Sequence, residues 1–267
     1  MSIIGDYHMH TPRCKHADGP LEAYAEQAIH LGLREIGFSD HSPLPNGMGA
    51  NVRMDEDELD DYVADVLKVR EAYWGDLAVR LGIELDFVEG VEEFNAKLLA
   101  AYPWDYVIGS VHYLDPDCCF PSWPRKYTGD VHALYAKYFE QIRKMARSGQ
   151  IDIVAHFDVA KRCGTPHGPA EADDITATLQ EIARCGLTME VNTSGYRHSD
   201  LLHREPYPGL PTVKQAVELN IPLMVNSDAH TPTHLCTQFA VVEAQLRSFG
   251  CRSLVRFEGR RRITYPL

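Results

Sequence analysis

The pattern of hydrophobic and polar positions alternates along the chain between short, nearly continuous apolar runs and longer stretches whose apolar residues have helical spacing. Runs of the first kind are typical of strands in a parallel sheet whose face is covered by helices. We therefore predict seven strands, at residues 3–8, 35–39, 79–87, 106–114, 151–156, 188–192 and 223–227.

Each predicted strand is followed by a stretch with helical spacing. Seven such units predict an α/β protein with a TIM-type (β/α)7 barrel, and the absence of repeats and linkers indicates a single domain over residues 1–267. An open doubly wound sheet is the alternative, but neither GxGxxG nor GxxxxGK[ST] opens a helix. The predicted helices cover residues 21–31, 57–74, 91–102, 131–148, 172–184, 212–219 and 237–249.

The charge and composition of the chain argue against several kinds of partner. With 38 acidic and 26 basic residues, the net charge of −12 disfavours a broad nucleic-acid or anionic membrane footprint. No apolar run approaches the roughly 20 residues of a membrane span, and no secretion signal is recognisable at the N-terminus. Seven cysteines without CxxC spacing indicate reduced thiols. We expect a cytoplasmic protein, either a monomer or a homodimer, that binds neither nucleic acid nor membrane.

Titratable side chains gather where the predicted strands end. In both α/β architectures function lies at the carboxyl ends of the strands. The strand period of two puts His8 and His10 on one face, and Asp228 and His230 repeat that spacing after the last strand. Imidazole and carboxylate groups are ligands for Zn²⁺, Mn²⁺ or Fe²⁺. The other strands end near Asp40 and His41, Glu84 and Asp86, His112, His156 and Asp158, and Glu190 and Asn192.

Each of these residues also has an ordinary structural explanation. A lone histidine at a strand end is more often a rim residue, and Asp40 or Asp228 could form a cap or a turn. Glu84 is harder to explain in this way, because an unpaired carboxylate in an apolar strand is costly. Recurrence at nearly every strand favours a multinuclear metal centre. Outside it we place His30 and His132 on helices and His167, His198, His203 and His234 in loops, with His198 and His234 bordering a substrate pocket.

The ordered set of candidate ligands resembles that of the polymerase and histidinol phosphatase (PHP) family. The resemblance extends from residue 6 to residue 230 and is carried by DYHMHTPRCKHADG (6–19), GFSDHSPLP (37–45), GSVHYLD (109–115), AHFDVAKRCG (155–164), EVNTSGYRH (190–198) and NSDAH (226–230). One departure is Gly209, where the family tends to have Ser after the preceding Pro. The resemblance implies a distorted seven-stranded barrel with three divalent metal ions at its carboxyl-terminal mouth.

The resemblance also implies roles for individual residues. His8, His10, Glu84 and Asp228 would hold the first ion; Glu84, His112 and His156 the second; and His16, His41 and His230 the third. Either Lys161 or Arg162 would be the family's cationic substrate contact, and we favour Arg162.

The chemistry of such a centre independently suits phosphomonoester hydrolysis. Closely spaced metals form a hydroxide near neutral pH and neutralise phosphoryl oxygens, so a hydroxide bridging the first two ions is expected to attack phosphorus. The predicted catalytic residues are Asp228, His230 and Arg197, with Arg197 also binding phosphate and Asp228 passing a proton to the leaving alkoxide. We expect carboxylates near the ligands to accept the outer ring N–H groups of the histidines. The candidates are Asp6, Asp40 and Asp158.

Within the family the chain is most similar to the histidinol-phosphate phosphatases, which implies hydrolysis of L-histidinol phosphate in histidine biosynthesis. A PHP phosphoesterase for another small phosphomonoester or nucleotide is the first alternative. A catalytically idle metal-binding scaffold and a metallohydrolase of C–N bonds are the others. All nine ligand positions are filled, which disfavours the scaffold, and Glu84 stands where many C–N hydrolases have a bridging modified Lys.

Overall fold

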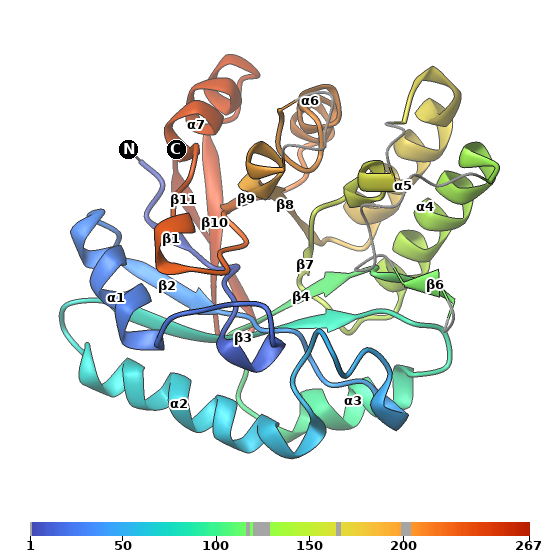
Figure 1. Ribbon diagram of the computed structural model, residues 1–267. Coiled ribbons are helices and arrows are strands. Elements are labelled where there is room, and N and C mark those ends of the chain that lie inside the picture. Colours follow the sequence, from blue (N-terminus) through green and yellow to red (C-terminus); the bar gives the residue numbers. More distant parts are fainter. Residues whose placement is uncertain (1, 116–117, 120–128, 164–166, 199–203) are drawn as a thin grey trace.

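The computed structural model describes residues 2–115, 118–119, 129–163, 167–198 and 204–267. Seven parallel strands form one sheet in chain order, with helices on its outer side (Figure 1). Each predicted strand overlaps one of them, so the prediction of a distorted (β/α)7 barrel is confirmed. The strands are β1 (Gly5–Asp6), β2 (Glu35–Phe38), β3 (Ala78–Asp86), β4 (Tyr106–Ser110), β7 (Ile153–Val154), β8 (Thr188–Asn192) and β9 (Leu223–Asn226).

The distortion lies where the first and last strands meet. In the described part of the chain, a single parallel bridge joins the two sides, between Met9 after β1 and Ala229 after β9. Nearer the strands, side chains take the place of the missing backbone partners. Asn226 Oδ1 accepts from the Tyr7 amide at 3.0 Å, and Asp6 Oδ1 accepts from the Ser227 amide at 3.0 Å. Two polar side chains thus complete the seam of the barrel.

All seven predicted helices are present, with small shifts at their ends. The second begins at Leu59 because a capping box between Asp55 and Glu58 first forms a separate 3₁₀ turn over Glu56–Glu58. The sixth begins earlier than predicted because Pro211 fits the first helical turn. The helices are α1 (Leu21–His30), α2 (Leu59–Ala72), α3 (Glu92–Ala101), α4 (Val131–Arg147), α5 (Ala172–Arg184), α6 (Leu210–Glu218) and α7 (Phe239–Ser248).

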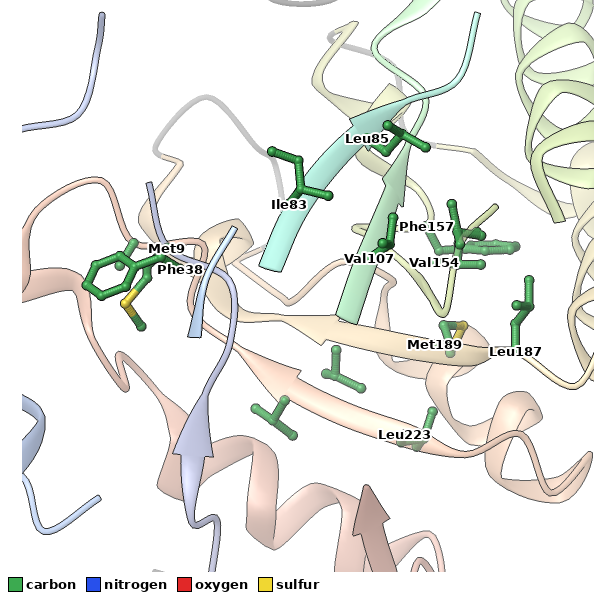
Figure 2. Packing of buried hydrophobic residues seen from close by; sticks show 14 of the residues in the cluster. Met9, Phe38, Ile83, Leu85, Val107, Val154, Phe157, Leu187, Met189 and Leu223 are labelled. Atoms are coloured by element: carbon green, nitrogen blue, oxygen red, sulfur yellow. The ribbon is translucent and has the colours of Figure 1, made fainter. Parts of the chain in front are cut away.

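Apolar side chains pack against both faces of the sheet, in two layers. The larger packs the outer face of the strands against the helices, and Figure 2 shows part of it, including Phe38, Val107 and Met189. The smaller lies inside the barrel, where Tyr106 packs so closely over Gly37 and Gly82 that a side chain at either glycine would collide with its ring. The inner layer consists of Tyr7, Tyr106, Ile108, Ile153, Ala155, Met224, Val255 and Phe257.

The last two residues of the inner layer come from a hairpin that we did not predict. It pairs β10 (Ser253–Glu258) with β11 (Arg261–Pro266) through a turn at Gly259 and Arg260, both with positive φ. The sequence signal for these strands, an alternation of apolar and polar positions, is weakened by five arginines between residues 252 and 262. The predicted strand 106–114 is also divided, because the chain leaves the sheet after Ser110 and pairs β5 (Tyr113–Asp115) with β6 (Cys118–Cys119). Within the described residues, no helix combines the length and apolar character that crossing a membrane requires.

Candidate metal centre

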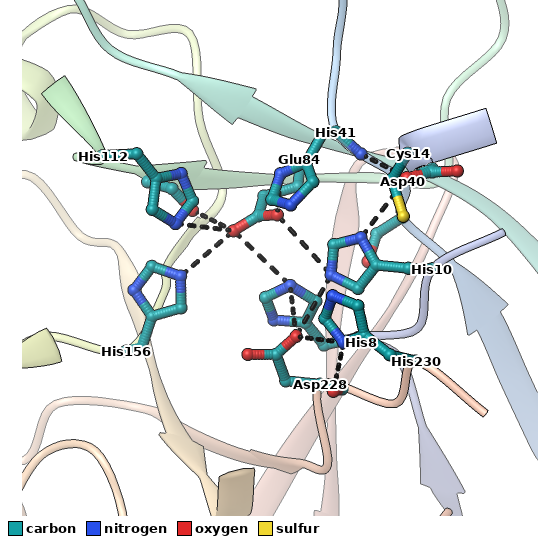
Figure 3. A network of polar contacts seen from close by, with 12 residues as sticks. His8, His10, Cys14, Asp40, His41, Glu84, His112, His156, Asp228 and His230 are labelled. Carbon is teal, nitrogen blue, oxygen red and sulfur yellow. Dashed lines mark hydrogen bonds and ion pairs between the residues drawn. The ribbon is translucent and has the colours of Figure 1, made fainter. Parts of the chain in front are cut away.

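All nine candidate ligands converge at the carboxyl-terminal mouth of the barrel. Figure 3 shows all of them except His16. Glu84 reaches the mouth from within β3, and the other eight lie in segments that follow β1, β2, β4, β7 and β9. The deepest part of the centre is withdrawn from solvent, since His8, His10 and Glu84 are each at most 1% exposed, whereas His16 at its rim is exposed. The candidates are His8, His10, His16, His41, Glu84, His112, His156, Asp228 and His230.

Glu84 occupies the middle of this cluster, and five imidazoles lie within 4 Å of its carboxylate. Ser110 Oγ also donates to Glu84 Oε1. The imidazole nitrogens lie at 2.7 Å for His41, 3.1 Å for His156, 3.5 Å for His8, 3.7 Å for His10 and 3.9 Å for His112. Such a position allows one carboxylate to be shared between neighbouring cations.

Asp228 is the second carboxylate of the cluster. Its Oδ1 lies 3.1 Å from His10 Nε2, and its Oδ2 accepts from Asn192 Nδ2 at 3.2 Å and Ser194 Oγ at 3.3 Å. Its φ of 54° is in the left-handed region, which is uncommon for residues other than glycine. Two guanidinium bonds hold this turn, because Arg197 donates to the carbonyls of Ser227 and Asp228 at 2.8 Å each.

Five of the histidine rings have an acceptor behind them at Nδ1. An acceptor there fixes the Nδ1–H tautomer and leaves the Nε2 lone pair directed into the cluster, as in many metal sites. The acceptors are Glu190 for His8 at 2.7 Å, Asp40 for His10 at 3.3 Å, Asp86 for His112 at 2.9 Å, the Cys14 carbonyl for His16 at 2.7 Å and the Asp228 carbonyl for His230 at 3.0 Å.

The prediction of carboxylates behind the ligands is therefore confirmed for Asp40 and wrong for Asp6 and Asp158. Asp6 accepts from the amides of Ser227 and Cys236 at the barrel seam. Asp158 accepts from Lys161, His167 and the Gly209 amide. Proximity in sequence to a ligand does not decide which way a carboxylate points.

The other two carboxylates behind ligand rings are Glu190, at His8, and Asp86, at His112. Both had a usable signal in the sequence. Asp86 follows Glu84 by two residues in one strand, and Glu190 precedes Asn192 by two in another, so the strand period directs each pair toward the same side.

Several polar atoms of the cluster are buried without a hydrogen-bond partner among the described residues. They include His8 Nε2 and His156 Nδ1. His41 Nδ1 and Glu84 Oε2 lie 2.7 Å apart, but their orientation does not make a hydrogen bond. A buried polar atom left unpartnered costs on the order of 1–3 kcal/mol, so such a concentration calls for a ligand.

The donor atoms also fall into overlapping groups, in each of which they lie within 4.8 Å of one another. Their nitrogen and oxygen chemistry fits divalent transition metals. Three of the groups are His8, His10 and Glu84; Glu84, His112 and His156; and His16, His41 and His230. Two further groups combine His10, Cys14 and His230, and His41, Asp86 and His112.

The electrostatics of the cluster show how strongly its carboxylates attract positive charge. Burial alone would lower the pKa of His8, but the carboxylates of Glu190, Asp228 and Glu84 outweigh it and raise this pKa well above 6.5. In contrast, burial lowers the pKa of His41 to about 4. The rings of His10 and His41 lie only 4.4 Å apart, so they resist being charged together. Protonated imidazoles can therefore neutralise only part of the negative charge of the carboxylates. The remaining charge favours the binding of other cations.

A cavity of about 570 Å³ opens directly above the cluster. His198 and His234 line it, as predicted, whereas His30 and His132 are exposed on helices and His167 binds Asp158. His203 lies outside the described residues. The remaining wall is made by Val52, Arg53, Val159, Arg162, Ser194, Arg197 and Tyr207.

The two cations that follow the fifth barrel strand have different surroundings. Lys161 is 2% exposed and its Nζ lies 3.2 Å from Asp158 Oδ2 and 3.1 Å from Glu205 Oε1. Arg162 instead lines the cavity, as does Arg197. Arg162 is therefore the one of the two placed to meet a ligand, while Arg197 both borders the cavity and holds the turn at Asp228.

The chain is also similar to known proteins. The PHP domain family model matches residues 6–194. A "Probable histidinol-phosphatase" from Deinococcus radiodurans is 37% identical over 95% of this chain and 96% of that protein. The "Histidinol-phosphatase" of Bacillus subtilis is 28% identical over 84% of this chain and 92% of that protein.

Solved structures show the same fold at lower sequence identity. The histidinol phosphate phosphatase of Lactococcus lactis, complexed with Zn, L-histidinol and phosphate, has a TM-score of 0.79 and 16% identity, covering 97% of this chain and 98% of that one. An enzyme from Listeria monocytogenes described as a histidinol phosphatase candidate has a TM-score of 0.77 and 20% identity, covering 89% of this chain and 99% of that one.

Proposed function

The chain belongs to the PHP domain family, and from that premise we propose that it is a metal-dependent histidinol-phosphatase. It hydrolyses the phosphomonoester of L-histidinol phosphate to L-histidinol and phosphate, with residues 1–267 acting as one phosphatase domain. The observation that carries the proposal is the cluster of seven imidazoles and two carboxylates on the floor of a cavity, with unpartnered atoms at its centre.

Three divalent ions, of Zn, Mn or Fe, are the proposed cofactors. Ions held there would supply a nucleophile near neutral pH and neutralise the charge of the phosphoryl oxygens. Glu84 is proposed to bridge the first two, because imidazoles approach both of its oxygens. The three ligand sets are His8, His10, Glu84 and Asp228; Glu84, His112 and His156; and His16, His41 and His230.

The cationic side chains of the cavity wall are proposed to orient the substrate. Arg162 donates to the phosphate from the cavity wall. Arg197 has five N–H donors and uses two on the carbonyls of Ser227 and Asp228, so it can turn others toward the same phosphate. Both residues act by positioning and charge neutralisation, which phosphoryl transfer needs more than covalent catalysis.

Asp228 is proposed to carry a proton during the reaction as well as to bind metal. Burial would raise its pKa, but His8, His10 and His230 outweigh burial and hold the pKa well below its usual range. The side chain therefore enters the reaction as a carboxylate. It can pass to the leaving alkoxide only a proton that it has first accepted within the site. His230 is assigned to metal binding beside it.

The test is to purify the protein with its metals retained, count them, and measure phosphate release from L-histidinol phosphate. Other phosphomonoesters, a nucleotide and an amide are measured in parallel. We expect two to three metals per chain and selective release from L-histidinol phosphate. If metals are present but only other esters are hydrolysed, the metal centre stands and the substrate assignment is wrong. If both metals and activity are absent, the proposal is rejected.

A further inference from the structure

Arg53 is the feature of the mouth that the proposed chemistry leaves unused. It lies in the segment between β2 and α2, and at 2% exposed it is one of the bulkiest side chains that the described residues bury. Arg53 is also part of the cavity wall. Burying a guanidinium is costly unless its donors are well placed, so its partners show what it is for.

The guanidinium connects two strands of the barrel at their carboxyl ends. Its Nη1 donates to the Ser42 carbonyl at 2.7 Å, beside His41. Its Nη2 donates to Asp86 Oδ2 at 2.6 Å and to the Tyr113 hydroxyl at 3.2 Å. The guanidinium thus contacts the backbone after β2 and a carboxylate at the end of β3.

Two of these partners adjoin candidate metal ligands. The other oxygen of Asp86, Oδ1, lies 2.9 Å from His112 Nδ1 and accepts from the His112 amide at 3.2 Å. Ser42 is the neighbour of His41 in the chain, and its amide binds the Glu84 carbonyl at 2.9 Å. Arg53 is therefore one contact removed from His112 and one residue removed from His41.

We propose that Arg53 is a positioning residue of the metal centre: its planar guanidinium fixes the separation between the backbone beside His41 and the carboxylate behind His112. These two histidines belong to ligand sets of different ions, so Arg53 sets the spacing between the second and third ions. The inference rests on the proposed metal centre and adds to it a residue outside the nine candidate ligands.

The local packing favours arginine over any other cation at this position. A lysine ammonium is a single point that cannot reach two acceptors in the fixed geometry of a planar fork. The loop is also built around this group, since a side chain at Gly49, where φ is +66°, would lie 2.8 Å from Arg53 Nε and 2.0 Å from the Tyr113 hydroxyl. Arg53 Nε itself has no hydrogen-bond partner among the described residues, so fixed geometry rather than complete pairing characterises the site.

Arg53→Lys tests this role, and Arg70→Lys is its matched control. Arg70 makes the same kinds of contact at the other end of the barrel, to Asp105 Oδ2 at 2.5 Å and to the Val79 carbonyl at 2.7 Å. Metal-free protein is titrated with Co²⁺ against a competing chelator, and the dissociation constants and visible absorption spectra are recorded. We expect Arg53→Lys to weaken the binding of at least one Co²⁺ ion by about 10–100-fold, as loss of a supporting partner does. The visible spectrum of bound Co²⁺ should change as well. Arg70→Lys should match the wild type.

The outcomes separate this inference from the proposed function. Wild-type protein that binds no Co²⁺ would reject the metal centre itself. Wild-type affinity and spectrum in Arg53→Lys would overturn the positioning role while leaving the centre in place. Thermal unfolding gives a second readout, since both variants are expected to lower the Tm of metal-free protein and only Arg53→Lys should reduce the increase in Tm on adding Co²⁺. If Arg53→Lys does not fold, Tyr113→Phe removes one contact of Nη2; weaker Co²⁺ binding would support the role and unchanged binding would overturn it.

Discussion

The two ends of the barrel both bury charged side chains, but they treat them differently. At the amino end, Asp105 Oδ2 accepts from Arg70 and from the Leu81 amide, and its Oδ1 accepts from the Gly259 amide of the hairpin turn. At the carboxyl end, Glu84 is instead surrounded by imidazoles, with His41 Nδ1 at 2.7 Å from one of its oxygens and His156 Nε2 at 3.1 Å from the other.

Glu35 makes the same point at the amino end. Arg80 lies 3.1 Å from its Oε2 and Arg256 lies 3.0 Å from its Oε1, while the Tyr7 hydroxyl donates to Oε2 at 3.2 Å. Arginine and backbone N–H groups thus satisfy the carboxylates there permanently. Histidines at the mouth can lose a proton and offer a lone pair instead. Buried charge therefore does not identify the site by itself, whereas incomplete hydrogen bonding among groups that can ligate a metal does.

Replacing the central carboxylate should give the largest difference between the two ends. Glu84→Gln keeps the shape but removes the charge that neighbouring cations share, so we expect loss of at least one metal and a fall in kcat/KM of about 1000-fold or more, equivalent to ~4 kcal/mol. Metal analysis and phosphate release measure both. Asp105→Asn is the control, and it should lower the Tm without changing metal content. Equal metal loss in the two variants would remove the distinction between the ends.

Truncating Phe257, which the β10–β11 hairpin contributes to the inner layer, should affect stability alone. Phe257 is 3% exposed in the inner layer beside Tyr106, so Phe257→Ala is expected to cost about 3–5 kcal/mol in the free energy of unfolding. Urea unfolding of the metal-free protein measures this cost. Metals per folded chain and kcat/KM should stay at wild-type values. A folded variant that no longer binds metal would show that the hairpin supports the centre directly.

The pH dependence of stability should single out the mouth. In the metal-free protein burial lowers the pKa of His41 to about 4 from 6.5, so below pH 6.5 the unfolded chain takes up a proton that the folded chain refuses. Stability assigned to His41 is therefore present above pH 6.5 and lost as the pH falls toward 4. Between pH 7 and pH 5 the loss should be on the order of 2 kcal/mol.

His41→Gln isolates this contribution. Urea unfolding of the metal-free wild type and variant at pH 7 and pH 5 gives the free energies to compare. The variant lacks the titrating ring, so relative to wild type it should become more stable as the pH is lowered. A difference between the two proteins that is the same at both pH values would contradict the assignment.

The sequence predicted the parts of this comparison that depend on local pattern and order. Seven apolar runs defined the strands, and a parallel sheet brings their carboxyl ends together, so convergence of His8, Glu84 and His156 could be expected before the structure was known. The direction of a side chain beyond a strand end depends on tertiary contacts, and for that reason Asp6 turned to the barrel seam rather than to a ligand. The role of Arg53 could not be predicted, because Asp86 and Tyr113 reach it from other segments of the chain.

The smallest expected effect concerns Gly209, in the segment that leads into α6. A Cβ at this position would lie 2.8 Å from both carboxylate oxygens of Glu205, one of which accepts from Lys161 at 3.1 Å. Gly209→Ser should displace that carboxylate, which is partly exposed and able to rotate. Lys161 keeps Asp158 and the Pro206 carbonyl as acceptors, so we expect a loss of about 1 kcal/mol or less, with unchanged metal content.

Double-variant analysis shows whether the glycine serves this ion pair. In a Glu205→Ala background the carboxylate is gone, and adding Gly209→Ser should then cost nothing further in thermal unfolding. The same cost in both backgrounds would mean that serine disturbs the backbone, whose Gly209 amide donates to Asp158 Oδ2 at 2.9 Å. Tyr207 belongs to the same segment and lines the cavity. If Gly209→Ser acts only through Glu205, we therefore expect it to change KM and to leave kcat unchanged. The glycine would then be an adjustment of the cavity wall, separate from the metal centre below it.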